Sequence, residues 1–158
     1  MEPHRHIRYI GVHIVFYSSD KGKTWQVQET PIVQGETMTG IFTADFYDEN
    51  IGLIAGGNYE KPTQNFQNKA ITKDGGKTWN LIGENTGFGY ASCVQFVPKS
   101  KGKGIVSVGA TGLHYSADGG HTWKQFLTDP TLYTIRFLDE DTAFAAGKDK
   151  IVKIEFKK

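Results

Sequence analysis

The sequence contains one cysteine, Cys93, in 158 residues. A single cysteine excludes an intramolecular disulfide and a metal site built on several thiolates. No apolar run approaches the ~20 residues that a membrane-spanning helix needs, so we expect no membrane span. The opening residues "MEPHRHIRYIGVHIVF" have a short apolar part, interrupted by His13, and no small-residue cleavage site, so they do not resemble a secretory signal.

Excess charge and cofactor motifs are also missing. Lys and Arg number 18 against 17 Asp and Glu, which gives a net charge of +1 and no general attraction to nucleic acid or to anionic lipid. No G-x-G-x-x-G follows a predicted strand, and no C-x-x-C is present. His4 and His6 have the spacing of two zinc ligands, but we interpret them as part of an irregular tail. We therefore expect no cofactor, no metal and no nucleic-acid partner.

Glycine and strand-forming residues are abundant. The chain has 19 glycines, and Ile, Val, Thr, Tyr and Phe are spread evenly along it. This composition is typical of many short strands joined by tight turns, so we predict an all-β fold.

One eight-residue pattern, [ST]-x-D-x-G-x-T-W, occurs three times: "SSDKGKTW" at 18–25, "TKDGGKTW" at 72–79 and "SADGGHTW" at 116–123. Asp, Ser and Thr side chains bond to nearby backbone in turns, and Gly allows a positive φ. We expect each Asp to hold its own turn, and each Trp to bury its ring on a neighbouring strand. A calcium site is disfavoured, because calcium takes six to eight oxygens and each copy offers one carboxylate. The positions are Ser18, Asp20, Gly22, Thr24 and Trp25; Thr72, Asp74, Gly76, Thr78 and Trp79; and Ser116, Asp118, Gly120, Thr122 and Trp123.

A longer unit surrounds this motif. Residues 46–57 align without gaps on 137–148, and 96–110 is the same unit with a longer turn. Together they predict four-stranded antiparallel meanders, the blades of a β-propeller, which recur every ~40 to 50 residues. After an irregular segment 1–12, we expect this region to fill 13–158, as a partial blade 13–30, full blades 40–83 and 90–127, and a partial blade 132–156. Since closure takes about 4 to 8 blades, we predict an incomplete ring of about three blades, part of a longer propeller.

The three motif copies resemble the Asp-box, or bacterial neuraminidase repeat (BNR), at blade spacing. Families with this repeat include sialidases, xyloglucan-degrading endoglucanases, the sortilin luminal domain and the photosystem II stability and assembly factors. The compact blades are most similar to the assembly-factor-like group of bacterial propellers. The resemblance implies that the boxes lie on the turn between the third and fourth strands, away from the ligand face, and that the protein works outside the cytoplasm.

Loops at the other end of the blades are therefore the candidate site. We call these segments the loop face: 58–68, 110–112, 147–150, 29–39, 83–90 and 127–131. Binding residues concentrate on loops carried by a rigid scaffold. The candidate binding residues are Tyr59, Glu60, Phe66, Glu84, Phe88, Tyr90 and Asp129.

These observations favour a non-catalytic binding or assembly module whose partner is a protein or a glycan. The alternative is a carbohydrate-active propeller, either a glycoside hydrolase or a glycan-binding protein, because sugars stack on aromatic rings. Sialidase activity is disfavoured, since the chain has only Arg5, Arg8 and Arg136 and lacks the Arg-Ile-Pro segment that the sialidase resemblance would imply. Open blade edges at both ends predict self-association.

Overall fold

The structure is a computed structural model and describes residues 13–156. Segment 1–12, with His4 and His6, lies outside the described residues. Thirteen β-strands and no helix occur in the described range, which confirms the all-β prediction. No helix there could cross a membrane.

The strands form four antiparallel sheets, and in each sheet consecutive strands pair with one another. The first sheet has two strands, the next two have four each, and the last has three. Their bounds are β1 Ile14–Tyr17 and β2 Gln26–Glu29; β3 Thr39–Phe46, β4 Gly52–Asn58, β5 Lys69–Thr72 and β6 Asn80–Leu81; β7 Ala91–Phe96, β8 Ile105–Gly109, β9 Gly112–Ser116 and β10 Lys124–Leu127; and β11 Leu132–Phe137, β12 Thr142–Gly147 and β13 Lys150–Glu155. These are the meanders of propeller blades, as predicted.

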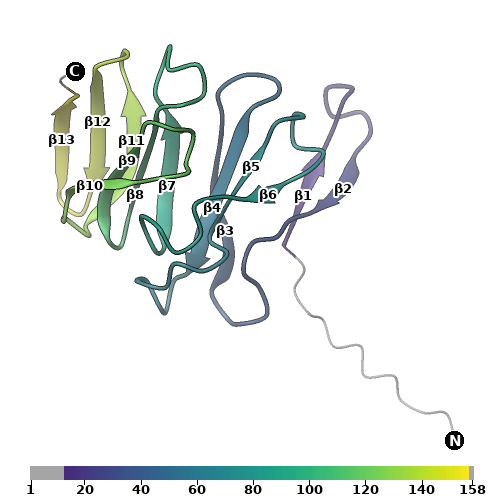
Figure 1. The fold of residues 1–158 in the computed structure, drawn as a ribbon, viewed down its shortest axis with the longest axis horizontal. Coiled ribbons are helices and arrows are strands. Elements are labelled where there is room, and N and C mark those ends of the chain that lie inside the picture. The colour runs from purple at the N-terminus through teal and green to yellow at the C-terminus, as the bar shows by residue number, and fades with distance from the viewer. Residues whose placement is uncertain (1–12, 157–158) are drawn as a thin grey trace, which may run out of the picture.

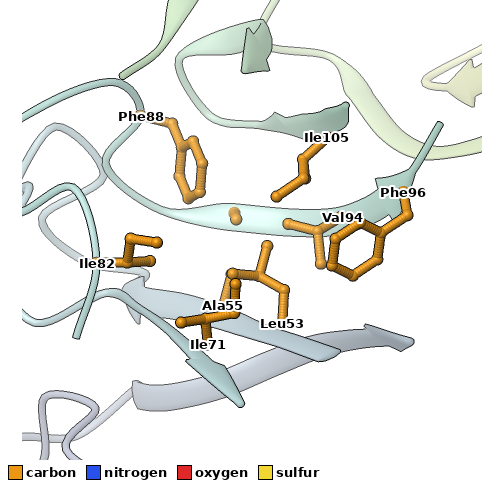
Figure 2. Close-up of a cluster of buried hydrophobic side chains, with 9 residues drawn as sticks. Leu53, Ala55, Ile71, Ile82, Phe88, Val94, Phe96 and Ile105 are labelled. Carbon is orange, nitrogen blue, oxygen red and sulfur yellow. The ribbon is translucent and has the colours of Figure 1, made fainter. Parts of the chain in front are cut away.

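The hydrophobic core lies between successive sheets. One cluster joins Leu53 and Ile71 of the second sheet to Phe88, Val94 and others near the third sheet (Figure 2). Two further clusters join the first sheet to the second and the third to the last. Because both faces of a middle sheet are covered, strands β4 and β8 are buried along their whole length, without the alternation of buried and exposed residues seen in a half-solvated strand.

Side-chain acceptors connect the innermost strands. Thr43 Oγ1 accepts a hydrogen bond from Val94 N at 3.1 Å, and Asp45 Oδ2 accepts one from Phe96 N at 2.7 Å. One sheet further on, Gln95 Oε1 accepts from Phe137 N at 2.9 Å. An inner strand has no neighbouring strand on its inner edge, so these bonds satisfy backbone donors that burial would otherwise leave without a partner. They fix the height of each blade relative to the next.

The four sheets form an open series. Sheet β1–β2 lies at one end of the molecule and β13 at the other (Figure 1). With two complete blades and two partial ones among the described residues, the ring is incomplete, as predicted.

Candidate binding site

Each Asp-box is a closed network of short hydrogen bonds. In the second box, Asp74 Oδ1 accepts from Thr78 N at 2.9 Å and Oδ2 accepts from Thr78 Oγ1 at 2.6 Å. Thr72 Oγ1 donates to Asp74 Oδ1 and accepts from Gly76 N at 2.8 Å. Gly76 has a φ of 93°, the left-handed region that glycine favours. The hydrogen bonds from Thr78 and Thr72 lower the pKa of Asp74 to about 2, so this carboxylate holds its own turn.

The same geometry recurs in the other two boxes. Thr24 N lies 2.8 Å from Asp20 Oδ1, and Thr122 N lies 2.9 Å from Asp118 Oδ1. Burial alone would raise the pKa of Asp118, but hydrogen bonds from Thr122 and Ser116 bring it down to about 2. Among residues 13–156, no group of three or more His, Cys, Asp or Glu is placed to hold a metal.

The box tryptophans pack toward the preceding sheet. Trp79 is buried beside Ile32, and its Nε1 donates to Gly76 O. Trp123 meets Phe88 edge to face, with ring centroids 4.8 Å apart. Trp25 is different: 61% of it is exposed. The prediction that every box tryptophan is buried is therefore wrong for the first copy, because no sheet precedes β1–β2 within the described residues.

A β-bulge interrupts each inner strand, at the second residue of β7 and β11 and midway along β3. The register shifts once in each pairing of β3 with β4, β7 with β8, and β11 with β12. The residue at the shift is Phe42, Ser92 or Tyr133. Bulges redirect a side chain away from the regular alternation of a strand, and here two of the three line the depression described next.

A depression of about 580 Å³ opens on the loop face. Its walls come from the loop 58–68, from β7 and the connection before it, from the β8–β9 turn, and from β11 and the connection before it. The lining residues are Tyr59, Pro62, Tyr90, Ser92, Ala110, Pro130 and Tyr133. No carboxylate is among them. Aromatic and proline rings with a few hydroxyls make this a contact surface rather than a proton-transfer site.

Hydrogen bonds fix the loop 58–68 to the next blade. Tyr90 N donates to Pro62 O at 2.8 Å, and Asn68 Nδ2 donates to Phe88 O at 2.8 Å. A Cβ at Gly89 would lie 2.1 Å from Pro62 O, so only glycine permits this approach. The loop therefore presents Tyr59 and Pro62 from a rigid base.

Comparison with known sequences and structures agrees with this geometry. The sequence model of the BNR/Asp-box repeat matches residues 16–27 and 70–81. The chain carries BNR/Asp-box repeats. The third Asp-box is recognised from its pattern and its hydrogen bonds. A search of curated protein sequences gave no significant match.

Several solved structures share the fold of this Asp-box chain. A GH74 enzyme from Niastella koreensis superimposes with a TM-score of 0.65 and 19% identity, over 90% of this chain and 24% of the enzyme. YCF48 from Cyanidioschyzon merolae gives a TM-score of 0.61 and 17% identity, over 91% of this chain and 45% of that protein. A structure of YCF48 bound to D1 peptide gives a TM-score of 0.57 and 22% identity, over 73% of this chain and 37% of that protein. The Asp-box chain thus spans less than half the length of each.

The structure brings together some of the sequence-predicted residues of this Asp-box chain. Tyr59 and Tyr90 line the depression and contact each other. Glu60 follows Tyr59 in the same turn, where its N–H donates to Asn58 Oδ1. Phe66 is exposed on the same loop but does not line the depression. Burial raises the pKa of the Tyr90 hydroxyl, with Tyr59 adding to the rise and Ser92 opposing it, so Tyr90 stays a protonated donor.

Two predicted residues belong elsewhere. Phe88 is only 1% exposed and packs between sheets against Trp123 and His114, with Lys69 Nζ 4.9 Å from its ring centre. It is a core residue, so its prediction as a ligand contact is wrong. Glu84 is exposed and does not line the depression. The nearby Thr86 Oγ1 donates to His121 O, which places this part of the connection beside the next Asp-box.

Asp129 lies at the edge of the loop face. Its carboxylate pairs with Lys150 and accepts from Thr131 N and Oγ1. The hydrogen bonds from Lys150 and Thr131 lower the pKa of Asp129 to about 2. Asp129 is therefore an ionised, fully engaged group that orders the connection carrying Pro130.

The sequence did not reveal Tyr133, Pro62, Pro130, Ser92 or Ala110 as lining residues. One usable signal was present: aligning the three inner strands puts Phe42, Ser92 and Tyr133 at one position. The β-bulge at that position turns these side chains toward the loops, and this bulge could not be predicted from the sequence.

Proposed function

We propose that this chain is a non-catalytic binding module, and that the depression on the loop face takes an extended segment of a protein partner. The observation that carries the proposal is the lining itself: three tyrosines and two prolines around about 580 Å³, without a carboxylate. Tyrosine offers a large, rigid surface with a hydroxyl for orientation. Aromatic-lined grooves are a recurring surface for extended, proline-containing segments.

The arrangement of the rings supports a preformed site. Tyr90 is held between Phe42 and Tyr59, edge to face with both, at centroid distances of 4.8 Å and 5.2 Å. The outer rings, Tyr59 and Tyr133, are exposed. Because the buried ring of Tyr90 holds Tyr59 in place, a partner can dock on Tyr59 without ordering it first. The fold that this chain shares with YCF48, solved with a D1 peptide, is compatible with the same mode.

The proposal is tested with a phage-displayed library of random linear peptides, selected on the full chain. We expect enriched peptides with aromatic or proline residues whose affinity falls at least ten-fold in Tyr59→Ala and Tyr133→Ala. Phe66→Ala is the matched control, since Phe66 is an exposed aromatic of the same loop outside the depression. The absence of any enriched peptide, or peptides that bind both tyrosine variants at full affinity, would rule the proposal out.

A glycan is the second candidate, favoured by the two exposed rings, on which sugars could stack, and by the fold shared with a GH74 enzyme. Glycoside hydrolysis requires two carboxyl groups about 5 to 9.5 Å apart, and none lines the depression. This candidate therefore predicts binding without turnover. A glycan array on which binding occurs and disappears in Tyr59→Ala would favour it over the peptide, and a blank array would exclude it.

A further inference from the structure

We propose that the chain associates head to tail with a second copy of itself, through two sheet faces that no other sheet covers within the described residues 13–156. The head face is formed by Phe16 and Trp25 on sheet β1–β2. The tail face is formed by Phe144 and Ile151 on sheet β11–β13. This association is independent of the depression on the loop face.

The strand register shows that the tail face is an inter-blade surface. Each inner strand ends in a phenylalanine, and the residue before it pairs with a residue of the second strand. These second-strand residues are Leu53, Val106 and Phe144, so the three occupy the same position in their sheets. Leu53 and Val106 are fully buried against the next sheet. Phe144, at the same position, is 43% exposed. This position is thus apolar in all three sheets, and in the last one no further sheet covers it among the described residues.

The third strand repeats this relationship. Lys69, Leu113 and Ile151 occupy one position, since they pair with equivalent residues of the second strand. Lys69 and Leu113 are buried, whereas Ile151 is 76% exposed. Phe144 and Ile151 therefore lie exposed on one face of the last sheet, at positions where the earlier sheets are buried against a neighbour.

The head face is identified by the Asp-box. Trp79 and Trp123 pack against the preceding sheet, and Trp25 is the equivalent residue of the first box, which no sheet precedes among residues 13–156. Phe16 lies two residues before the first box, as Ala70 and His114 do before the others. Those two are buried, while Phe16 is 63% exposed.

The two faces are complementary by construction. Two of the three junctions between sheets join a box-tryptophan face to the opposite face of the preceding sheet, through Trp79 in one and Trp123 in the other, and the junction between the third and last sheets contains no tryptophan. Among residues 13–156, one face of each kind has no neighbouring sheet, and these two faces lie at opposite ends of the molecule (Figure 1). One chain therefore cannot join them, but two copies repeat the same junction. Such a contact is heterologous, and it produces a ring or an extended series.

Charges on the tail face do not oppose the contact. Lys153 is paired with Glu155 at 2.6 Å. Arg136 Nη1 turns back to donate to Ile135 O at 2.7 Å and to Cys93 Sγ at 3.2 Å. Burial of Phe144 and Ile151 thus requires no isolated charge to lose its hydration.

The test is light scattering coupled to size-exclusion chromatography, on the full 158-residue chain from micromolar to millimolar concentration. We expect a mass that rises to at least twice 17.6 kDa. Trp25→Glu and Ile151→Glu should each remain monomeric. An equimolar mixture of the two variants should regain a species of two chains and no larger one, because each variant contributes one intact face. Leu138→Glu is the control, since Leu138 is exposed but outside both faces.

Three results would overturn the proposal: a wild type that is monomeric over the whole range, a mixture of variants that stays monomeric, or an Ile151→Glu protein that still associates. The last would show that head face meets head face. Trp25 also packs on its own turn near Gly22, so Phe16→Glu and Phe144→Glu form a second pair if circular dichroism shows that a first variant is unfolded.

Discussion

Tyr59 and Tyr90 meet edge to face, with ring centroids 5.2 Å apart and ring planes at 87°. The first lies in the long loop of one blade, and the second lies just before the inner strand of the next. The contact spans a junction between two blades, so the surface that these tyrosines form exists only when the blades are stacked. Changes to the stacking should therefore alter both stability and binding.

Leu53→Ala should lower the free energy of unfolding by about 2 to 5 kcal/mol, because Leu53 is fully buried in the cluster between the second and third sheets. Chemical denaturation monitored by tryptophan fluorescence measures the change. Leu138→Ala is the control, and as an exposed site it should stay within about 0.5 kcal/mol of wild type. Equal effects of the two substitutions would contradict the assignment of the core.

Gln95→Leu should cost about 1 to 3 kcal/mol, since it leaves Phe137 N without its acceptor at the centre of the propeller. Gln95→Glu, which keeps an acceptor oxygen, should lower the free energy of unfolding much less. Denaturation of the two variants side by side provides the measurement. A leucine variant as stable as the glutamate variant would mean that the bonds between inner strands contribute little.

The Asp-boxes predict a loss of stability in acid. The pKa values of Asp74 and Asp118 are about 2 in the folded chain, against an ordinary value of 3.8. A carboxyl whose pKa is lowered by folding stabilises the fold at any pH above its pKa in the unfolded chain. This contribution disappears as the pH falls from about 4 to about 2. Melting temperatures over this range should fall less steeply in Asp74→Asn than in wild type. An identical slope in both proteins would argue against the turn network.

Lys69 predicts a change at the alkaline end. Burial lowers the pKa of its ammonium from 10.5 to about 8, although Glu84 partly opposes the shift. Between these values the unfolded chain binds more protons than the folded one, so stability should rise with pH from about 8 to about 10. Lys69→Met should remove that part of the rise, as shown by the difference between the two stability curves. Parallel curves would mean that Lys69 is solvated.

The sequence was informative where structure is local and weak where it depends on neighbouring sheets. Asp74, Thr72 and Thr78 bond within seven residues, so the box, its turn and the blade spacing could be predicted from the pattern alone. The surroundings of Phe88, Trp25 and Lys69 are set by which sheet lies beside them, and no local pattern encodes this. The sequence therefore predicted Phe88 as a loop residue and Trp25 as a buried one, and it predicted no role for Lys69.

The candidate site follows the same division. Loops on the face opposite the boxes were expected, and Tyr59 and Tyr90 were among the residues named. Tyr133 was missed because its direction depends on a bulge between Leu132 and Thr134, a feature of strand pairing. Asp129 was named for its charge, yet its place in an ion pair with Lys150 makes it structural.

We propose that partners bind on the loop face and not on the Asp-box face. The most direct measurement is an amide ¹H–¹⁵N spectrum of the chain, titrated with a peptide selected from the library. We expect shifts at Tyr59, Ser92 and Tyr133 and none at Asp20, Asp74 and Asp118. Shifts centred on the box turns, with the loop face unchanged, would contradict it.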